Sequence, residues 1–275
     1  MTTLSADRIT VAFGDQVAVD DVSLAVDSGA SVGLVGESGS GKTTVARVMC
    51  GLQPPGSGEV RLDGQRLPRR RSVAQRRAVQ MVFQDPFGSL NPRRRIGSML
   101  TELLRVHGLA KGAEAARALE LLELVGLPAA ALDRYPAAFS GGQRQRLAIA
   151  RALAAEPRSV IADEPVSALA VSVQATVLRV FAQLRSELDI GLLLISHNLA
   201  VIRVLCETVA VGEVPATPSQ QAESAPPLTG GCPYAPVCPL VQQICRERAP
   251  ALEPVGTGPR RAACHFRDEP ARRIR

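Results

Sequence analysis

Residues 36–44 read Gly36-Glu37-Ser38-Gly39-Ser40-Gly41-Lys42-Thr43-Thr44, and this stretch decides the fold. It matches the phosphate-loop pattern of glycine, any four residues, glycine, lysine, and serine or threonine. An apolar, β-prone run at 31–35 precedes it and a helical run at 44–50 follows, which is the context that the motif requires. Glycines let successive N–H groups point at an anion, and a helix start adds unpaired donors. The stretch therefore predicts a nucleotide phosphate site.

Two side chains of this loop have predicted roles. Lys42 is expected to reach the β- and γ-phosphates, and the Thr43 hydroxyl is expected to bind Mg²⁺. Lys42 and Lys111 are the only lysines in a chain whose other basic residues are arginines, which argues against chance placement. The alternative is a Gly/Ser-rich turn that carries a surface lysine.

Length and composition limit the class of protein. The 275 residues suffice for one large or two ordinary domains. The net charge is +6 and only 3% of residues are aromatic, so the arginine clusters favour solvated surface over a nucleic-acid site. No apolar run approaches the roughly 20 residues of a membrane span, and the first ten residues lack the apolar centre of a signal peptide. We therefore expect a cytosolic protein whose membrane role, if it has one, requires partners.

Hydrophobic periodicity predicts an α/β fold. Residues 4–13 and 17–26 alternate and end in turn signals, which predicts an early antiparallel pair. Helical spacing at 96–127 predicts a helical insertion between strands. Alternating strands and helices imply a mostly parallel sheet covered on both faces. The buried strands are predicted at 31–35, 79–83, 160–162 and 192–195, with a helix at 171–188.

Two carboxylates extend the predicted site. Asp163 and Glu164 follow an apolar strand, at the carboxyl end where ligands bind in open α/β sheets. Asp163 is expected to hold the Mg²⁺ shell, and Glu164 is expected to orient or deprotonate a water. Acidic residues also follow strands as helix caps, so the pair alone leaves both interpretations open.

A second glycine-rich helix start lies far along the chain. Ser140 suits an N-cap, and the two glycines after it leave amide groups exposed at the positive end of a predicted helix at 144–154. One phosphate loop already wraps its own nucleotide, so a second anion site makes sense if it meets the γ-phosphate bound to another chain. An ordinary capped helix is the alternative.

The order of these motifs resembles the ATP-binding cassette (ABC) family over residues 4–211. Further stretches resemble the importer ATPases for oligopeptides, dipeptides or nickel, namely FQDPFGSLNP at 83–92 and ADEPVSAL at 162–169. The matching residues are Gly36 to Thr43 (Walker A loop), Gln84 (Q-loop), Ser140, Gly141, Gly142 and Gln143 (signature motif), Asp163 and Glu164 (Walker B pair) and His197 (switch histidine).

This resemblance implies a domain plan and site roles. It implies a P-loop NTPase (RecA-like) domain at 1–211, with a helical subdomain at about 87–157, a linker at 212–231 and a Cys-containing extension at 232–275. Phe13 takes the adenine-stacking position, where Tyr is usual; a core phenylalanine is the alternative. The implied catalytic residues are Lys42, Gln84, Glu164 and His197; the nucleotide-binding residues are Phe13, residues 36–44 and 140–143; and Mg²⁺ is held through Thr43, Gln84 and Asp163.

The resemblance also implies a function and partners. The chain would be the ATP-binding and ATP-hydrolysing subunit of an ABC importer for oligopeptides or dipeptides, with ATP and Mg²⁺ as cofactors. Two cassettes would close head to tail on two ATP molecules and drive two membrane permease subunits, with an extracytoplasmic substrate-binding protein as an indirect partner. We expect a peripheral position on the cytoplasmic face of the cell membrane and no nucleic-acid partner.

The chain departs from the family pattern at three places. Ala170 stands where the family has an Asp that links the two nucleotide sites, and Asn198 stands where Asp is usual. The part after Val211 is shortened, which we expect to weaken the sheet edge or partner contacts. These departures motivate one alternative, a degenerate cassette that does not hydrolyse ATP. A soluble cassette ATPase acting on nucleic acid is a further alternative.

Four cysteines stand in the tail. Cys232, Cys238, Cys245 and Cys264 are separated by five, six and eighteen residues. A cytosolic location argues against stable disulfides, and four thiolates suit a [4Fe–4S] cluster or zinc. The segment resembles the Cys-containing extension of peptide-importer ATPases. A cluster, zinc and free thiols all stay open, whereas Cys50 and Cys206 are expected in the core.

Overall fold

The computed structural model describes residues 2–37, 39–211, 231–232, 242–254 and 261–263. Ser38 of the phosphate loop, residues 212–230 of the predicted linker, and Cys238 and Cys264 of the tail lie outside these described residues.

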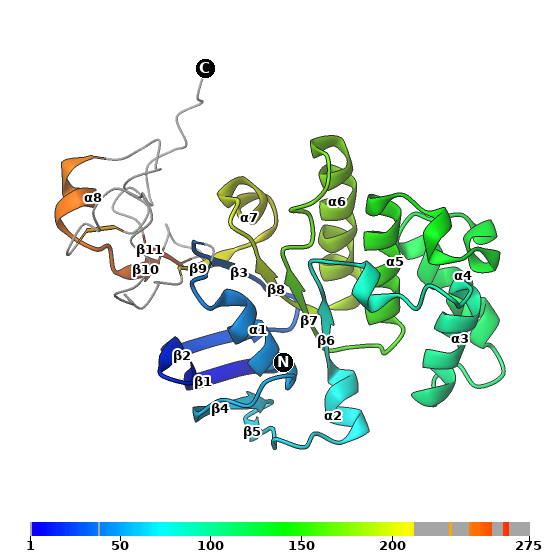
Figure 1. Cartoon of the computed structure of the whole chain (residues 1–275), viewed down its shortest axis with the longest axis horizontal. Helices are drawn as coiled ribbons and strands as arrows, with labels where there is room; N and C mark the ends of the chain where they lie inside the picture. Colours follow the sequence, from blue (N-terminus) through cyan, green and yellow to red (C-terminus); the bar gives the residue numbers. More distant parts are fainter. Residues whose placement is uncertain (1, 38, 212–230, 233–241, 255–260, 264–275) are drawn as a thin grey trace.

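A five-stranded parallel sheet forms the centre of the molecule, as the alternating strands and helices predict (Figure 1). Its order is β6-β7-β8-β3-β9. Every residue of β3, β7 and β8 is buried, because a parallel sheet is covered on both faces. The strands are β3 (Ser31–Val35), β6 (Val79–Val82), β7 (Ser159–Asp163), β8 (Gly191–Ile195) and β9 (Thr208–Val211).

Alternating side chains of these strands enter two separate cores. Leu34, Ile161 and Leu193 pack on the side of α1 (Lys42–Cys50) and the N-terminal strands. Their neighbours Ala162 and Leu194 pack on the opposite side, against the helices that cover the other face. Those helices are α5 (Gly141–Leu153), α6 (Val171–Leu188) and α7 (Leu199–Leu205).

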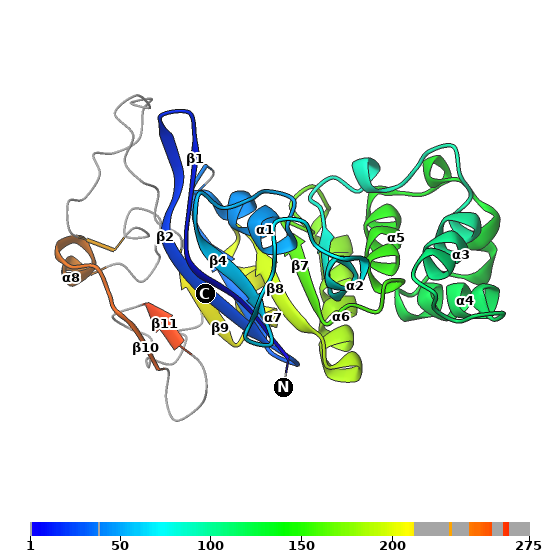
Figure 2. The ribbon, with the colours of Figure 1, turned by 90° about the horizontal axis from the view of Figure 1, so that it is seen from below.

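An antiparallel sheet of order β2-β1-β4-β5 covers α1 (Figures 1 and 2). The predicted early pair is confirmed, with a turn at Gly14, whose φ of +60° suits glycine. Leu4 and Ile9 are fully buried between this sheet and the central one. The strands are β1 (Thr3–Phe13), β2 (Gln16–Asp27), β4 (Ser57–Leu62) and β5 (Gln65–Arg66).

A helical part extends from one end of the central sheet, as predicted (Figure 2). Helices α3 (Ile96–Val106) and α4 (Glu114–Leu124) pack on α5 through fully buried leucines such as Leu104, Leu121 and Leu147. A short helix, α2 (Val73–Ala78), precedes β6. Three 3₁₀ turns complete this part at Phe87–Ser89, Ala129–Asp133 and Pro136–Ala138.

Two helices begin earlier than their sequence pattern predicts. Helix α1 begins at Lys42 rather than Thr44, because Gly41 adopts φ +82° and turns the loop directly into the helix. Helix α5 begins at Gly141, before the predicted helical run at 144–154, and Ser140 is its N-cap, as predicted. Both differences place loop residues of the predicted sites in the first turn of a helix.

The described part of the tail lies at the edge of the central sheet. Strands β10 (Leu252–Pro254) and β11 (Arg261–Ala263) pair antiparallel, and β11 lies beside the edge strand β9 (Figure 1). A short helix, α8 (Gln243–Glu247), precedes them. The tail therefore covers part of the edge that we expected the shortening after Val211 to weaken. No helix in the described part of the chain is long and apolar enough to cross a bilayer.

Candidate functional site

Four neighbouring strands deliver the predicted site residues to one edge of the sheet. The phosphate loop follows β3, Gln84 follows β6, Asp163 ends β7 with Glu164 next to it, and His197 follows β8. These strands are adjacent and parallel, so their carboxyl ends meet at the same edge. The topology therefore brings together residues that lie up to about half the chain apart.

The phosphate loop is wrapped around Lys42. Lys42 is only 6% exposed, and its ammonium group donates to the carbonyls of Gly36 (2.8 Å) and Glu37 and to the hydroxyl of Ser40 (3.1 Å). Burial lowers the pKa of Lys42, while the negative charges of Glu164, Asp163 and Glu37 oppose that shift. The loop thus holds a positive charge among backbone groups, where a phosphate would neutralise it.

Gly41 allows the loop to pass close to the β1–β2 hairpin. A Cβ atom at this position would lie 2.2 Å from the carbonyl oxygen of Ala18. Phe13 lies at the end of the same hairpin and is 53% exposed. The alternative of a core phenylalanine is therefore wrong, and the ring is free to meet a planar ligand.

Asp163 is a buried carboxylate with an unpaired oxygen. It is 4% exposed, it is hydrogen-bonded by Thr43, and its Oδ1 meets no hydrogen-bond partner among the described residues. Burial raises the pKa of Asp163 and Glu164 adds to the rise, whereas the Thr43 hydrogen bond and the charges of Arg47 and Lys42 lower it. An unpaired carboxylate oxygen beside a threonine hydroxyl fits Mg²⁺, which prefers oxygen ligands.

Glu164 is held in position by groups from three directions. Its backbone has φ +46°, and its N–H donates to the carbonyl of Ile195 (2.9 Å). Its Oε1 lies 3.0 Å from Nδ1 of His197, and its Oε2 lies 3.4 Å from Nε2 of Gln84. The three predicted residues Gln84, Glu164 and His197 are thus brought into contact. The side chain of Glu164 is less exposed than that of His197.

Ser167 belongs to this cluster, and our sequence analysis gave it no role. Its hydroxyl lies 3.4 Å from Nε2 of Gln84 and donates to the carbonyl of Glu164 (3.1 Å). Serine hydroxyls often bond to the backbone in turns. A serine three residues after Glu164 was therefore the sequence signal that could have placed Ser167 beside it.

The second glycine-rich helix start faces outward. Ser140 and Gln143 form a capping box, with the Gln143 N–H donating to the Ser140 hydroxyl (3.4 Å) and the Ser140 N–H to Oε1 of Gln143 (2.9 Å). Ser140 and Gly141 are exposed, while Gly142 is buried where a Cβ would lie 2.1 Å from Cγ1 of Val173. Among the described residues, no hydrogen bond joins residues 140–143 to the phosphate loop.

Two of the four tail cysteines, Cys232 and Cys245, are among the described residues. The Cys232 N–H donates to the carbonyl of Cys245 (2.6 Å), and Cys245 is buried. No group of three or more metal-ligating side chains occurs within the described residues, so the [4Fe–4S] cluster and zinc stay predictions. Cys50 is in the core as expected, and burial raises its pKa to about 12. Cys206 is only half-buried, because it ends α7 at the rim of the core.

Comparison with known proteins places this geometry in a family. The family model described as "ABC transporter" matches residues 19–167. A protein of Brucella abortus (strain 2308), named "Putative peptide import ATP-binding protein", is 40% identical over 290 residues, covering 90% of this chain and 86% of the relative. A Brucella ovis protein that is also named "Putative peptide import ATP-binding protein" is 48% identical over 197 residues, covering 70% of this chain and 62% of the relative. The first match must extend into the tail, since it covers 90% of the chain.

Solved structures share the fold. A dimeric ATP-binding cassette in a post-hydrolysis state with ADP and phosphate has a TM-score of 0.67 and 28% identity, covering 78% of this chain and 97% of that one. The cbiO1 protein from Clostridium perfringens has a TM-score of 0.69 over 76% of this chain and 83% of its own, and its 23% identity carries the fold alone. From the family model, the relatives and the fold together, the chain belongs to the ABC transporter family and is an ABC-type ATPase.

Proposed function

We propose that the chain is the ATP-hydrolysing subunit of a peptide importer. One observation carries the hydrolytic part of the proposal: Glu164 is held between His197 and Gln84, next to the buried carboxylate of Asp163. The peptide-import names of the Brucella relatives support the substrate class. The cargo would contact membrane subunits rather than this chain.

In the binding step, the chain's own groups neutralise and orient the triphosphate. Lys42 exchanges its loop carbonyls for the β- and γ-phosphate oxygens, and the N-terminal end of α1 adds backbone donors. Phe13 offers an exposed ring for the adenine base. Thr43, Asp163 and Gln84 would hold Mg²⁺, which supplies charge neutralisation at the phosphates when bound.

In the hydrolytic step, Glu164 orients a water molecule and accepts its proton as the water oxygen attacks the γ-phosphorus. The bond from that phosphorus to the β–γ bridging oxygen breaks, and ADP leaves. Gln84 and His197 fix the carboxylate, and His197, which is 58% exposed at its side chain, can also donate to the γ-phosphate. A positioned general base contributes about 10²- to 10⁴-fold in rate.

The exposed start of α5 is our reason for including a second cassette in the proposal. Ser140 and Gly141 are exposed and leave the first-turn amides of α5 at the surface. In our proposal these groups meet the γ-phosphate held by a partner's phosphate loop, while the partner's residues do the same for this chain. Closure of the pair then moves two permease subunits at the cytoplasmic face of the membrane.

The proposal includes a division of the chain. Residues 1–211 form the cassette with a helical subdomain at about 87–157, residues 212–231 form a linker, and residues 232–275 form the extension. The packing of α3 and α4 against α5 supports the helical subdomain. Limited proteolysis should cut first between 212 and 231 and leave the cassette whole; first cuts inside 1–211 would contradict the division.

The test is reconstitution from the native membrane. With the full chain as bait, detergent-solubilised membranes should yield permease subunits and a second cassette. Vesicles that carry the recovered complex should take up a labelled peptide with ATP, and Lys42→Ala should abolish the uptake while Lys111→Ala, the other lysine, retains it. Tight ATP binding without hydrolysis, together with uptake powered by the partner alone, would establish the degenerate cassette instead. Recovery of ribosomes or DNA would contradict the importer.

For the tail, the narrower proposal is a metal site built from the four cysteines. Cys232 and Cys245 lie close together, as their 2.6 Å backbone hydrogen bond requires. Anaerobic purification should give a brown protein with iron and acid-labile sulfide for a [4Fe–4S] cluster, or stoichiometric zinc for a zinc site. A colourless protein with neither metal would leave free thiols as the answer.

A further inference from the structure

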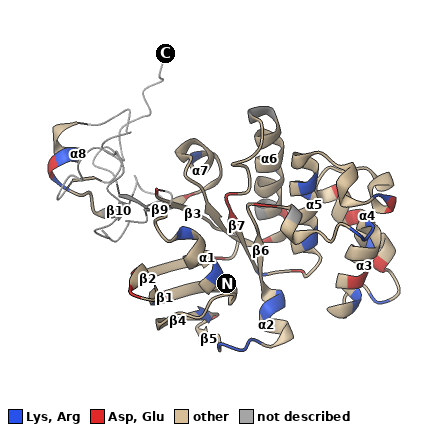
Figure 3. Ribbon diagram, in the orientation of Figure 1, with Lys and Arg blue, Asp and Glu red and all other residues tan. Residues whose placement is uncertain are grey.

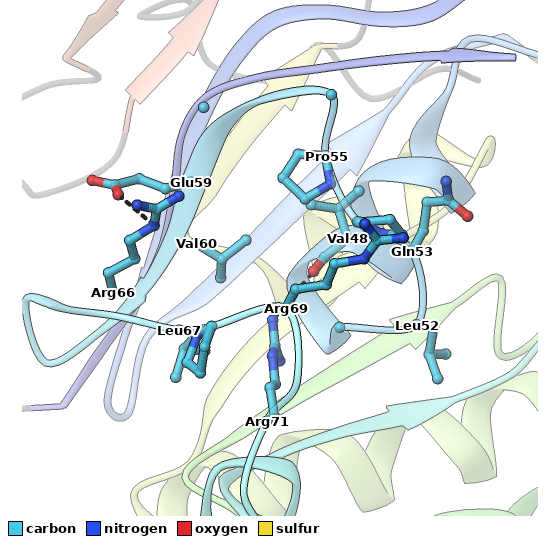
Figure 4. A pocket seen from close by; sticks show the side chains of 15 residues that line it. Val48, Leu52, Gln53, Pro55, Glu59, Val60, Arg66, Leu67, Arg69 and Arg71 are labelled. Atoms are coloured by element: carbon cyan, nitrogen blue, oxygen red, sulfur yellow. Dashed lines mark hydrogen bonds and ion pairs between the residues drawn. The ribbon is translucent and has the colours of Figure 1, made fainter.

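A cavity lies at the end of α1 that is opposite to the phosphate loop (Figure 4). Its walls are the end of α1, the following loop at 51–56, strand β4, and the segment that runs from β5 to α2. Its volume is about 710 Å³. Cavities of about 300–1,000 Å³ are typical of small-molecule sites.

Arg71 presents an unpaired donor in the wall of this cavity. Its Nη2 donates to the carbonyl of Val48 (3.3 Å), at the negative end of α1. Its Nη1 is shielded from solvent and meets no hydrogen-bond partner among the described residues. Buried donors in folded proteins are almost always paired, and this nitrogen gains an acceptor when the half-buried guanidinium turns toward the cavity that Arg71 lines.

Gly51 makes the room that Arg71 occupies. Its φ is +79°, and a Cβ at this position would lie 2.5 Å from Nε of Arg71. Burial lowers the pKa of Arg71, because the charged guanidinium has lost part of its hydration. An anion beside it would restore the lost stabilisation.

The cavity lining carries more positive than negative side chains. Glu59, the one acidic residue of its lining, is already paired with Arg66 (3.1 Å) and with Arg61. No described carboxylate lies within ion-pair distance of Arg69 or Arg71. Residues 69–71 lie in the segment between β5 and α2, where Figure 3 shows a stretch coloured as Lys or Arg. Two guanidinium groups therefore stand at one side of the cavity with no counter-charge from the described part of the chain.

The remaining wall is largely apolar. Val48, Pro55, Val60 and Leu67 line it, and Leu67 is 8% exposed. Figure 4 shows Val60 and Leu67 between the Glu59–Arg66 pair and the side chains of Arg69 and Arg71. A ligand that fits would combine a compact apolar body with one anionic group.

We propose that this cavity binds a small molecule that carries one oxyanion, a carboxylate or a phosphate monoester, on a compact apolar body. The oxyanion pairs with Arg71 and Arg69, and the body packs on Val48 and Leu67. The site is distinct from the ATP site: α1 spans nine residues, so its two ends lie about 13 Å apart. The proposal does not depend on the transported cargo.

The test is calorimetric titration of the full chain with saturating Mg–ADP, which keeps the phosphate loop occupied. The probes share one body: 4-methylpentanoate, 3-methylbutyl phosphate and the neutral 4-methylpentanamide. At least one anion should bind saturably and the amide should not; the anion that binds more tightly identifies the carboxylate or the phosphate source.

Matched variants locate the binding. Arg71→Gln and the exposed Arg69→Gln should each weaken the preferred anion about tenfold or more, because each removes a charged hydrogen-bond donor. Arg70→Gln removes the same charge one residue away, outside the cavity lining, and should bind like the unchanged chain. Arg69→Gln keeps the test valid if Arg71→Gln fails to fold. Absence of saturable anion binding, equal binding of the amide, or equal losses in Arg70→Gln would overturn the proposal.

Discussion

The chain carries two glycine-rich helix starts that we propose bind anions, and they are built in different ways. The start of α1 is enclosed: Lys42 is 6% exposed, and the carboxylate of Asp163 stands at the end of β7, two strands from β3 in the same sheet. The start of α5 is open: Ser140 caps it, and no hydrogen bond from the described residues reaches it from the phosphate loop. The difference supports our proposal that the start of α1 binds the phosphates of this chain's own nucleotide, whereas the exposed start of α5 serves a nucleotide held by a second cassette.

The largest effect should come from the enclosed site. Glu164→Gln should lower the ATP hydrolysis rate by about 10²- to 10⁴-fold, because the amide cannot accept the proton of the attacking water. ATP affinity should stay within a few-fold, since Lys42 and the loop are unchanged. Single-turnover hydrolysis and equilibrium nucleotide binding measure the two quantities. Glu123→Gln on the exposed face of α4 is the control, and equal rates in Glu164→Gln and Glu123→Gln would remove Glu164 from the chemistry.

Substitutions at the two glycines of the α5 start should show how far the stability of the fold depends on the packing of α5 against α6. Gly142→Ala should lower the unfolding free energy by about 1–3 kcal/mol, because its methyl group would lie against Val173. Gly141→Ala is the matched control: its Cβ would lie 3.5 Å from Leu169, an ordinary contact, and alanine favours the helix. Chemical denaturation measures both. Equal stability of the two variants would mean that α5 does not need its close approach to α6.

Asp163→Asn should separate stability from function at the enclosed site. Burial raises the pKa of Asp163, so the ionised carboxylate destabilises the nucleotide-free fold at pH 7 relative to the protonated one. The penalty develops as pH rises through the unfolded pKa and is complete above the folded pKa. Removing the charge should therefore raise Tm, by about 2–4 °C per 1 kcal/mol gained.

The same variant should lose the thermal stabilisation that Mg–ATP gives the unchanged chain, because an amide is a poorer Mg²⁺ ligand than a carboxylate. Asp133→Asn, whose side chain is 85% exposed, should change neither quantity. An unchanged or lower Tm in Asp163→Asn would show that the buried charge is compensated, and the account of its unpaired oxygen would be wrong.

The smallest effect should come from Ala170, beside the open site. It is the N-cap of α6 and provides no side-chain cap. Ala170→Asp should stabilise the fold by about 1 kcal/mol, since a carboxylate accepts a first-turn N–H and complements the helix dipole. Thermal unfolding measures this, and Ala170→Asn separates capping from charge. If hydrolysis with a partner cassette also rises for Asp but not for Asn, Ala170 limits coupling between the two sites; no change in Tm would mean that another group already caps α6.

Several elements could be predicted because their signals are local. Helix α6 matches the predicted range 171–188, and β3 matches 31–35, since periodicity and flanking turns fix both. Apolar spacing placed the starts of α1 and α5 too late. Gly41 sets the first through its backbone geometry, and Ser140, which the sequence predicted as an N-cap, sets the second. The outward position of Phe13 also depends on where the hairpin ends.

The sequence alone determined which chemical groups are present: the phosphate loop with Lys42, the carboxylates after β7 and the capped glycines before α5 all read directly from short stretches. Only the tertiary structure decided which groups meet. Glu164 contacts His197 across 33 residues and Gln84 across 80. Oδ1 of Asp163 is buried without a partner among the described residues only because neighbouring strands and α1 pack around it. The physical reason is that strand order and burial depend on contacts between distant segments, and no local spacing carries that information.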